Sequence, residues 1–200
     1  MIHKTIGLLL AVGATAPVSG CMEAAPSRAQ MLPTEVSVSG SEQATVRGQR
    51  MSIYLTGYTF WDNTPPGSAQ IARPVLRQRA GGTGTWSDPV TIAVGHRIEG
   101  ARQVLDYPEG TRFYLPRLRK YAIVEDVCGD GPTPQSGPCH TGHQGLPWLD
   151  IWIGGSKVSR AQSDSCARRI TAVQEAVMHP PPDLPVETGE IAEGSCQTFG

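Results

Sequence analysis

Residues 105–155 read LDYPEGTRFYLP (105–116), RLRK (117–120), YAIVEDVCGD (121–130) and, after a loop rich in Pro, Gly and His, WLDIWIGG (148–155). Runs of β-branched, aromatic and other apolar residues between turn residues predict three short strands: Arg112–Leu115, Tyr121–Val124 and Leu149–Ile153. Asp126 lies where the second run ends, and Asp150 lies where the third begins. Because burial at such a position raises the pKa of a carboxyl group, the two residues form a candidate site.

The composition indicates a loop-rich β protein. The 200 residues are 39% hydrophobic and only 6% aromatic, with 23 Gly and 17 Pro. This mix favours short strands joined by long loops over a helical bundle. The 17 Lys and Arg residues face 18 Asp and Glu, which gives a formal net charge of −1. Since no basic field attracts phosphates, we expect no nucleic-acid partner.

Strands are also expected upstream of residue 105. Ser52–Trp61 has strong β propensity and predicts a long strand, so ordered structure should begin near Met51. Pro89–Val94 is a short apolar run of the same kind. Ile71–Gln78 is a third candidate, which Pro74 would confine to the edge of a sheet.

One amphipathic helix is expected near the C-terminus. Ser163 or Asp164 can cap its first turn, and the run of prolines at 180–182 would end it. Apolar residues recur on one face of it at helical spacing: Cys166, Ile170, Val173 and Val177. The tail to Gly200 is rich in Pro, Glu and Gly and is expected to be irregular.

The first 20 residues predict a bacterial secretory signal, with a basic Lys4 followed by an apolar run. Its end, VSGC at 18–21, resembles the bacterial lipobox, in which the peptidase cuts before the Cys and the sulfur receives a lipid. Cys21 would then anchor the protein to a membrane. Met22 lacks the retention signal of the inner membrane, which favours the outer membrane facing the periplasm. The alternative is an ordinary signal peptide with an incidental Cys.

Cysteine usage fits an exported protein. Besides Cys21, four cysteines remain: Cys128, Cys139, Cys166 and Cys196. An even remainder in an oxidising compartment predicts two disulfides, and of the three pairings we favour Cys128–Cys139 and Cys166–Cys196. The alternative is a metal site formed by Cys128, Cys139, His140 and His143, but His-x-x-His is a poor match to finger spacing. We therefore expect neither a metal nor another cofactor.

A family resemblance follows from the same stretch. Its motifs resemble the 3D (Asp-Asp-Asp) domain, the double-psi β-barrel of MltA-type lytic transglycosylases, which is related to the barrels of rare lipoprotein A and of expansins. The matching residues are Pro108, Gly110, Thr111, Asp126, Gly129, Asp150, Ile151, Trp152 and Gly154. The chain departs from the family pattern in lacking the first Asp near 100–102 and in placing Cys128 between Asp126 and Gly129.

The resemblance implies a mainly β fold, a six-stranded double-psi β-barrel with one C-terminal amphipathic helix and long loops. It also implies action on peptidoglycan or another polysaccharide as the partner, with cleavage of a glycosidic bond without water. Asp150 would be the catalytic acid and then base, with its pKa raised towards neutrality, and Asp126 would stay ionised beside it. The alternatives are a non-catalytic, expansin-like polysaccharide-binding module and an envelope lipoprotein that recruits protein partners.

Several other side chains are candidate substrate contacts. Tyr58, Trp61 and Trp152 are candidates for sugar binding, and His96 lies close to a strand end. The simpler interpretation of Trp152 is a role in the core. For His96 it is a surface or hydrogen-bonded structural role. The expected layout is a signal peptide at 1–20, a flexible tether at 21–50, the barrel at 51–162, and a helix with a disulfide-tied tail at 163–200.

Overall fold

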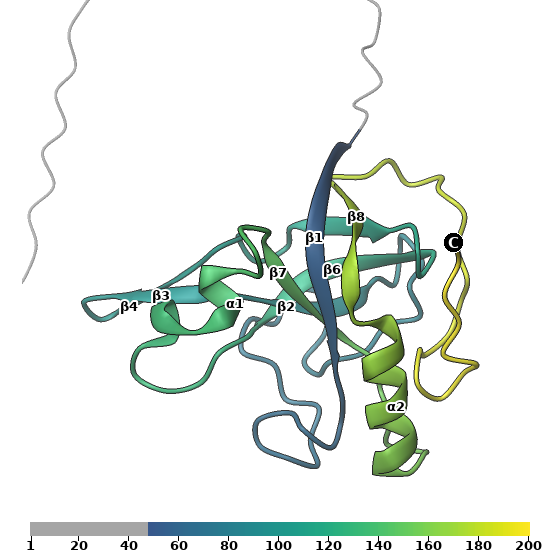
Figure 1. The fold of residues 1–200 in the computed structure, drawn as a ribbon, viewed down its shortest axis with the longest axis horizontal. Helices are drawn as coiled ribbons and strands as arrows, with labels where there is room; N and C mark the ends of the chain where they lie inside the picture. Colours follow the sequence, from purple (N-terminus) through teal and green to yellow (C-terminus); the bar gives the residue numbers. More distant parts are fainter. Residues whose placement is uncertain (1–47) are drawn as a thin grey trace, which may run out of the picture. The chain divides into compact units, whose positions relative to one another are not determined.

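The computed structural model describes residues 48–200, so the signal peptide, Cys21 and all but the last residues of the expected tether lie outside the described residues. Figure 1 shows a closed barrel of six strands in the order β1-β7-β2-β6-β5-β8. Its strands are β1 (Gln49–Tyr58), β2 (Val90–Val94), β5 (Arg112–Leu115), β6 (Lys120–Val127), β7 (Trp148–Trp152) and β8 (Ala172–Met178). The mainly β, six-stranded barrel expected from the sequence is confirmed.

Two of the six strand pairs are parallel and join segments far apart in the chain. β1 runs parallel to β7, and β2 runs parallel to β6. The remaining pairs, β1–β8, β2–β7, β5–β6 and β5–β8, are antiparallel. Because the sheet closes on itself, no strand of the barrel is left with an unpaired edge.

The core fills the barrel with aliphatic side chains. Ile53, Leu55, Ile92, Leu149 and Ile151 are fully buried. β2 is buried along its whole length and β6 along all but its last residue, so neither strand shows the alternating pattern of a half-exposed strand.

A hairpin and two short helices lie beside the barrel, in the part of the chain before β7. The hairpin of β3 (His96–Glu99) and β4 (Arg102–Leu105) forms its own two-stranded sheet. The one-turn helices η1 (Pro134–Ser136) and α1 (Pro138–Thr141) pack against this hairpin, and α1 also contacts β7 (Figure 1). The sequence analysis predicted neither the hairpin nor these turns of helix.

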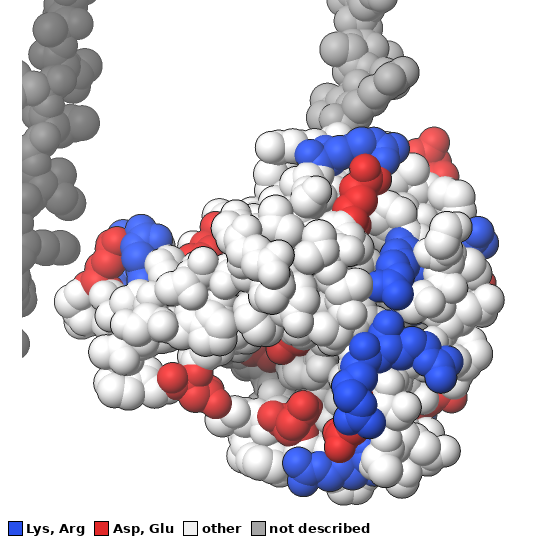
Figure 2. Space-filling model, in the orientation of Figure 1, with Lys and Arg blue, Asp and Glu red and all other residues white. Residues whose placement is uncertain are grey.

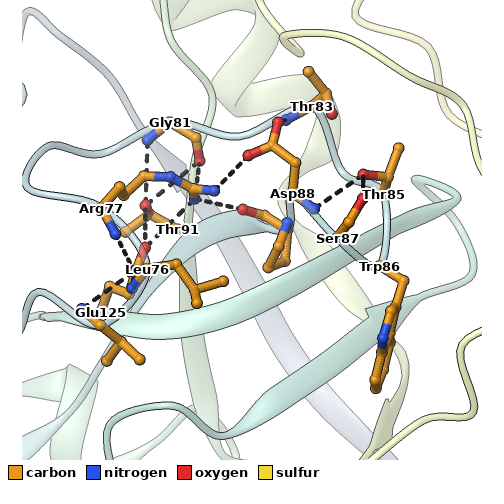
Figure 3. Close-up of polar contacts among 12 residues, drawn as sticks. Leu76, Arg77, Gly81, Thr83, Thr85, Trp86, Ser87, Asp88, Thr91 and Glu125 are labelled. Carbon is orange, nitrogen blue, oxygen red and sulfur yellow. Dashed lines mark hydrogen bonds and ion pairs between the residues drawn. The ribbon is translucent and has the colours of Figure 1, made fainter.

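The strand expected at Ile71–Gln78 is absent; the segment is a loop that wraps around the carboxylate of Glu125. Glu125 is fully buried on β6 and accepts hydrogen bonds from the backbone N–H of Leu76 (2.6 Å) and from the Thr91 hydroxyl (3.1 Å). Arg77 bridges Glu125 and Asp88, at 3.4 and 2.6 Å (Figure 3). Backbone groups of the loop therefore bond mainly to the Glu125 side chain, and the Arg73 N–H donates to the Glu125 carbonyl on β6 at 2.9 Å.

The C-terminal helix is shorter than expected, and its expected second half is a strand. α2 spans Arg160–Ile170, and Ser159 rather than Ser163 or Asp164 caps it, through a capping box with Gln162. Ser163, with Cys166 and Ile170, is buried on the helix. The chain turns extended at Thr171, and β8 then pairs with β1 and β5 to close the barrel. Pairing with two strands outweighs the helical spacing of Val173 and Val177, which are β-branched and fit a strand equally well.

Charge is distributed unevenly over the described surface. Figure 2 shows Lys and Arg gathered over α2 and β8, and α2 itself carries three exposed arginines: Arg160, Arg168 and Arg169. The surface over α1 and β7 is mostly uncharged in the same view. Among residues 48–200, no helix combines the length and apolar character needed to cross a membrane.

Candidate functional site

The two candidate carboxylates lie on either side of one small residue. Ala93 on β2 is in register with Asp126 on β6 and with Asp150 on β7. Residues in register on adjacent strands point to the same face, and neighbouring strands lie about 4.8 Å apart, so the two Cα atoms are about 10 Å apart on one face. β6 and β7 are not neighbouring strands in the barrel, because β2 lies between them. Ala93 is the β2 residue in register with both carboxylates.

Asp150 forms the floor of a cavity. Asp150 is half-buried and lines the cavity. The Thr56 hydroxyl on β1 donates a hydrogen bond to Asp150 Oδ1 at 2.6 Å, and Trp148 Nε1 donates to the Thr56 hydroxyl at 2.8 Å. Burial raises the pKa of Asp150 to about 7, and the charges of Asp62 and Asp126 add to this rise, while the Thr56 bond opposes it.

Asp126 is more deeply buried than Asp150 and is held by three donors. It accepts hydrogen bonds from the Tyr58 hydroxyl, the Ala72 N–H and the Val127 N–H, each at 2.9 Å. Burial raises the pKa of Asp126, and the three donors, which stabilise the ionised form, offset only part of that rise. It reaches the cavity through the Tyr58 hydroxyl.

The cavity, about 150 Å³ in volume, opens between the loop that follows β1 and the segment that follows β6. Asp62, whose carboxylate accepts bonds from the N–H and hydroxyl of Thr59, lines it on one side. The other side is lined by Cys128, Gly129 and Asp130. Asp150 and Tyr58 also line the cavity, and the carboxyl group of Asp150 is placed to exchange a proton with a ligand there.

The other predicted contacts are placed differently. Tyr58 and Trp152 are both buried and pack edge to face, with ring centroids 5.2 Å apart, so neither offers an open face for stacking. Tyr58 acts as a hydrogen-bond donor instead, and burial, followed by the charge of Asp126, raises its pKa well above the ordinary value. Trp61 is half-buried and donates its Nε1 to the Gly155 carbonyl at 2.9 Å.

His96 lies apart from this cavity. It is 3% exposed, its Nδ1 has no partner within residues 48–200, and burial lowers its pKa. The structure therefore brings together Asp126, Asp150 and Tyr58 but not His96. The sequence analysis missed Thr56. Alternation along β1 puts Thr56 on the face of Tyr58, but no sequence signal shows that β1 runs beside β7.

Both disulfide pairings favoured from the sequence are confirmed. Cys128 pairs with Cys139 and Cys166 with Cys196, with Cα atoms 5.8 and 5.7 Å apart. The alternative metal site loses its sulfur ligands, because the thiols of Cys128 and Cys139 are joined to each other. Within the described residues, no group of three or more His, Cys, Asp or Glu side chains is placed to hold a metal ion.

Comparison with known proteins places the chain in a family. The family described as the DDB_G0273701 N-terminal domain matches residues 50–197, which is nearly all of the described chain. The chain belongs to this family.

One relative is the Dictyostelium discoideum protein printed as "Uncharacterized protein DDB_G0273701/DDB_G0273221". It is 28% identical over 143 residues, which cover 70% of this chain and 56% of the relative. The chain thus spans little more than half the length of that protein. No solved structure matches the chain.

Proposed function

We propose that the barrel is a double-psi β-barrel that acts on peptidoglycan glycan strands and cleaves them in the manner of a lytic transglycosylase, with Asp150 as general acid and base. The observation that carries this proposal is a carboxyl group with a pKa of about 7 on the floor of an accessible cavity. A group that titrates near neutrality is equally suited to giving and to taking a proton.

The proposed reaction needs one group in both roles. Protonated Asp150 gives its proton to the glycosidic oxygen between N-acetylmuramic acid and N-acetylglucosamine, and the bond from that oxygen to the anomeric carbon breaks. The 6-hydroxyl of the muramic acid attacks the same carbon, and its proton returns to the Asp150 carboxylate. The product is a 1,6-anhydro sugar, and Asp150 ends in the protonation state in which it began.

The neighbours of Asp150 fit this cycle. Burial, followed by the charges of Asp62 and Asp126, raises the pKa of Asp150 and keeps the acid form populated at neutral pH. The Thr56 hydroxyl bonds one carboxyl oxygen and stabilises the ionised form that must take back the proton. That bond also fixes the orientation of the carboxyl group, which proximity effects require.

The strand pairing supports the double-psi assignment. Two parallel pairs, β1–β7 and β2–β6, are embedded in an otherwise antiparallel closed barrel of six strands. The motif residues Asp126 and Asp150 lie on the two strands that flank β2, one from each parallel pair. The proposed location is the cell envelope, with a lipid on Cys21 that holds the barrel at the outer membrane.

A second candidate function is a non-catalytic, expansin-like module that binds peptidoglycan or another polysaccharide. Its support is the depth of Asp126, which is 6% exposed and already uses its carboxylate for three internal bonds. Because hydrogen bonds within the protein already engage the Asp126 carboxylate, its role can be structural rather than catalytic.

Product analysis separates the two functions. The purified barrel is incubated with peptidoglycan sacculi, and the soluble products are identified by mass spectrometry. Anhydro-muropeptides from wild type and none from Asp150→Asn are expected. Asp183→Asn, which changes an exposed carboxylate in the tail, is the matched control and should act like wild type. Products with reducing-end sugars would indicate hydrolysis instead of the anhydro mechanism. Binding to sacculi without any products would support the non-catalytic binding module.

A further inference from the structure

A second pocket lies on the other side of Trp148 from the Asp150 cavity. It has a volume of about 320 Å³ and is lined by Asp106, Tyr107, His140, Leu146, Pro147 and Trp148, among others. We call it the Trp148 pocket. Its lining combines two aromatic rings and two aliphatic side chains with one polar pair, a mixture that is typical of sites for small polar ligands with apolar faces.

The indole of Trp148 is fixed before any ligand arrives. Its Nε1 donates to the Thr56 hydroxyl at 2.8 Å. Its ring lies edge to face with Tyr54, at 4.7 Å between centroids, and with His143, at 6.3 Å. Tyr54 and His143 are stacked on each other at 4.0 Å. Because three neighbouring side chains already fix the Trp148 ring, the ring loses little conformational entropy when a ligand binds.

The polar part of the pocket is a fixed pair. His140 Nδ1 and Asp106 Oδ1 are 2.6 Å apart, and the two side chains are 27% and 22% exposed, so solvent reaches both. The bond to Asp106 engages Nδ1 and sets the plane of the imidazole ring. Nε2 of His140 and the second carboxylate oxygen of Asp106 then present one nitrogen and one oxygen for hydrogen bonds with a ligand.

The Trp148 pocket and the Asp150 cavity are neighbours. Trp148 and Asp150 are two residues apart on β7, which puts them on one face about 6.6 Å apart along the strand. One hydroxyl, that of Thr56, is bonded to both side chains. The Cys128–Cys139 disulfide spans the same boundary, since Cys128 lines the cavity and Cys139 lines the pocket.

We propose that the Trp148 pocket is a sugar subsite that binds the ring next to the one held over Asp150, in a chain of N-acetylated amino sugars. The inference rests on the proposed function and adds to it the part of the glycan that the site recognises. The indole and Tyr107 contact the apolar faces of the ring, and the His140–Asp106 pair bonds its hydroxyl or acetamido groups. The mostly uncharged surface over α1 and β7 suits such a ligand (Figure 2).

Chain length is the variable that tests this subsite. In the Asp150→Asn protein, which should bind without cutting, affinities are measured for N-acetylglucosamine alone and for its four-ring oligomer. The oligomer is expected to bind more tightly, because a single ring cannot fill the cavity and the pocket together. His140→Ala should weaken binding of the four-ring oligomer about tenfold and bring it close to that of the single sugar.

Two controls keep the test decisive. His179→Asn changes an exposed histidine that lines neither pocket and should leave both affinities unchanged. Tryptophan fluorescence is a second measurement that does not depend on the His140 variant. The four-ring oligomer should alter the emission, and Trp148→Phe should remove that response.

The outcomes separate the inference from the function on which it rests. If wild type cleaves sacculi but His140→Ala binds the four-ring oligomer as well as its parent, the subsite is wrong and the proposed function stands. If neither the single sugar nor the four-ring oligomer binds and sacculi are neither bound nor cut, both are wrong.

Discussion

Asp150→Asn should abolish cleavage and at the same time stabilise the fold increasingly as the pH rises from about 4 to about 7. The folded protein holds the Asp150 proton up to a pH of about 7, whereas the same side chain in the unfolded chain loses it near the ordinary pKa of 3.8. Between these values the folded state binds more protons than the unfolded state, so the free energy of unfolding falls as the pH rises. The cost of ionising a buried carboxyl group in the fold is the physical reason.

The size of the effect follows from the two pKa values. A difference of about three pH units, at about 1.4 kcal/mol for each, amounts to about 4 kcal/mol by pH 8. The Asn side chain stays neutral at every pH and can still accept the Thr56 hydrogen bond. The variant should therefore match wild type near pH 4 and exceed its free energy of unfolding by about 4 kcal/mol at pH 8.

Urea unfolding followed by circular dichroism at half-unit steps from pH 4 to pH 9 measures this difference. Asp183→Asn is again the control, because it removes an exposed carboxylate and should leave the pH dependence of wild type unchanged. A difference between Asp150→Asn and wild type that stays constant from pH 4 to pH 8 would refute the raised pKa, and with it the argument for Asp150 as an acid at neutral pH.

Three further predictions test neighbouring parts of the structure. Thr56→Val removes a hydrogen bond that stabilises ionised Asp150 and should move the alkaline limb of the pH–rate profile up by about one pH unit, whereas Thr56→Ser should leave it in place. Glu125→Ala leaves several buried donors without their acceptor and should lower the free energy of unfolding by about 3 kcal/mol; a loss below about 1 kcal/mol in urea titrations would contradict this. Cys196→Ser should lower the free energy of unfolding by about 4 kcal/mol and Cys128→Ser by about 3 kcal/mol, because the two disulfides close loops of 30 and 11 residues. A larger loss for Cys128→Ser than for Cys196→Ser in urea titrations would contradict the loop-entropy argument.

The sequence by itself determined the local features of the barrel. β-branched and aromatic runs between turn residues predicted five of its six strands, because strand propensity and burial are expressed within a few neighbouring residues. The even number of cysteines besides Cys21 predicted two disulfides, and the pairing favoured from the sequence is the one observed. Asp126 and Asp150 were found because a carboxylate within an apolar strand is visible in the sequence alone.

The tertiary structure decided which of these features meet. The sixth strand, β8, has a pattern that fits a helix as well as a strand, and only pairing with β1 and β5 made it a strand. The position of Ala93 between Asp126 and Asp150 depends on the register of three strands. The bond from Thr56 to Asp150 depends on a parallel pairing of segments 94 residues apart. Propensity acts over a few residues, whereas register and strand order are set by how the whole core packs, so the environment that raises the pKa of Asp150 exists only in the folded barrel.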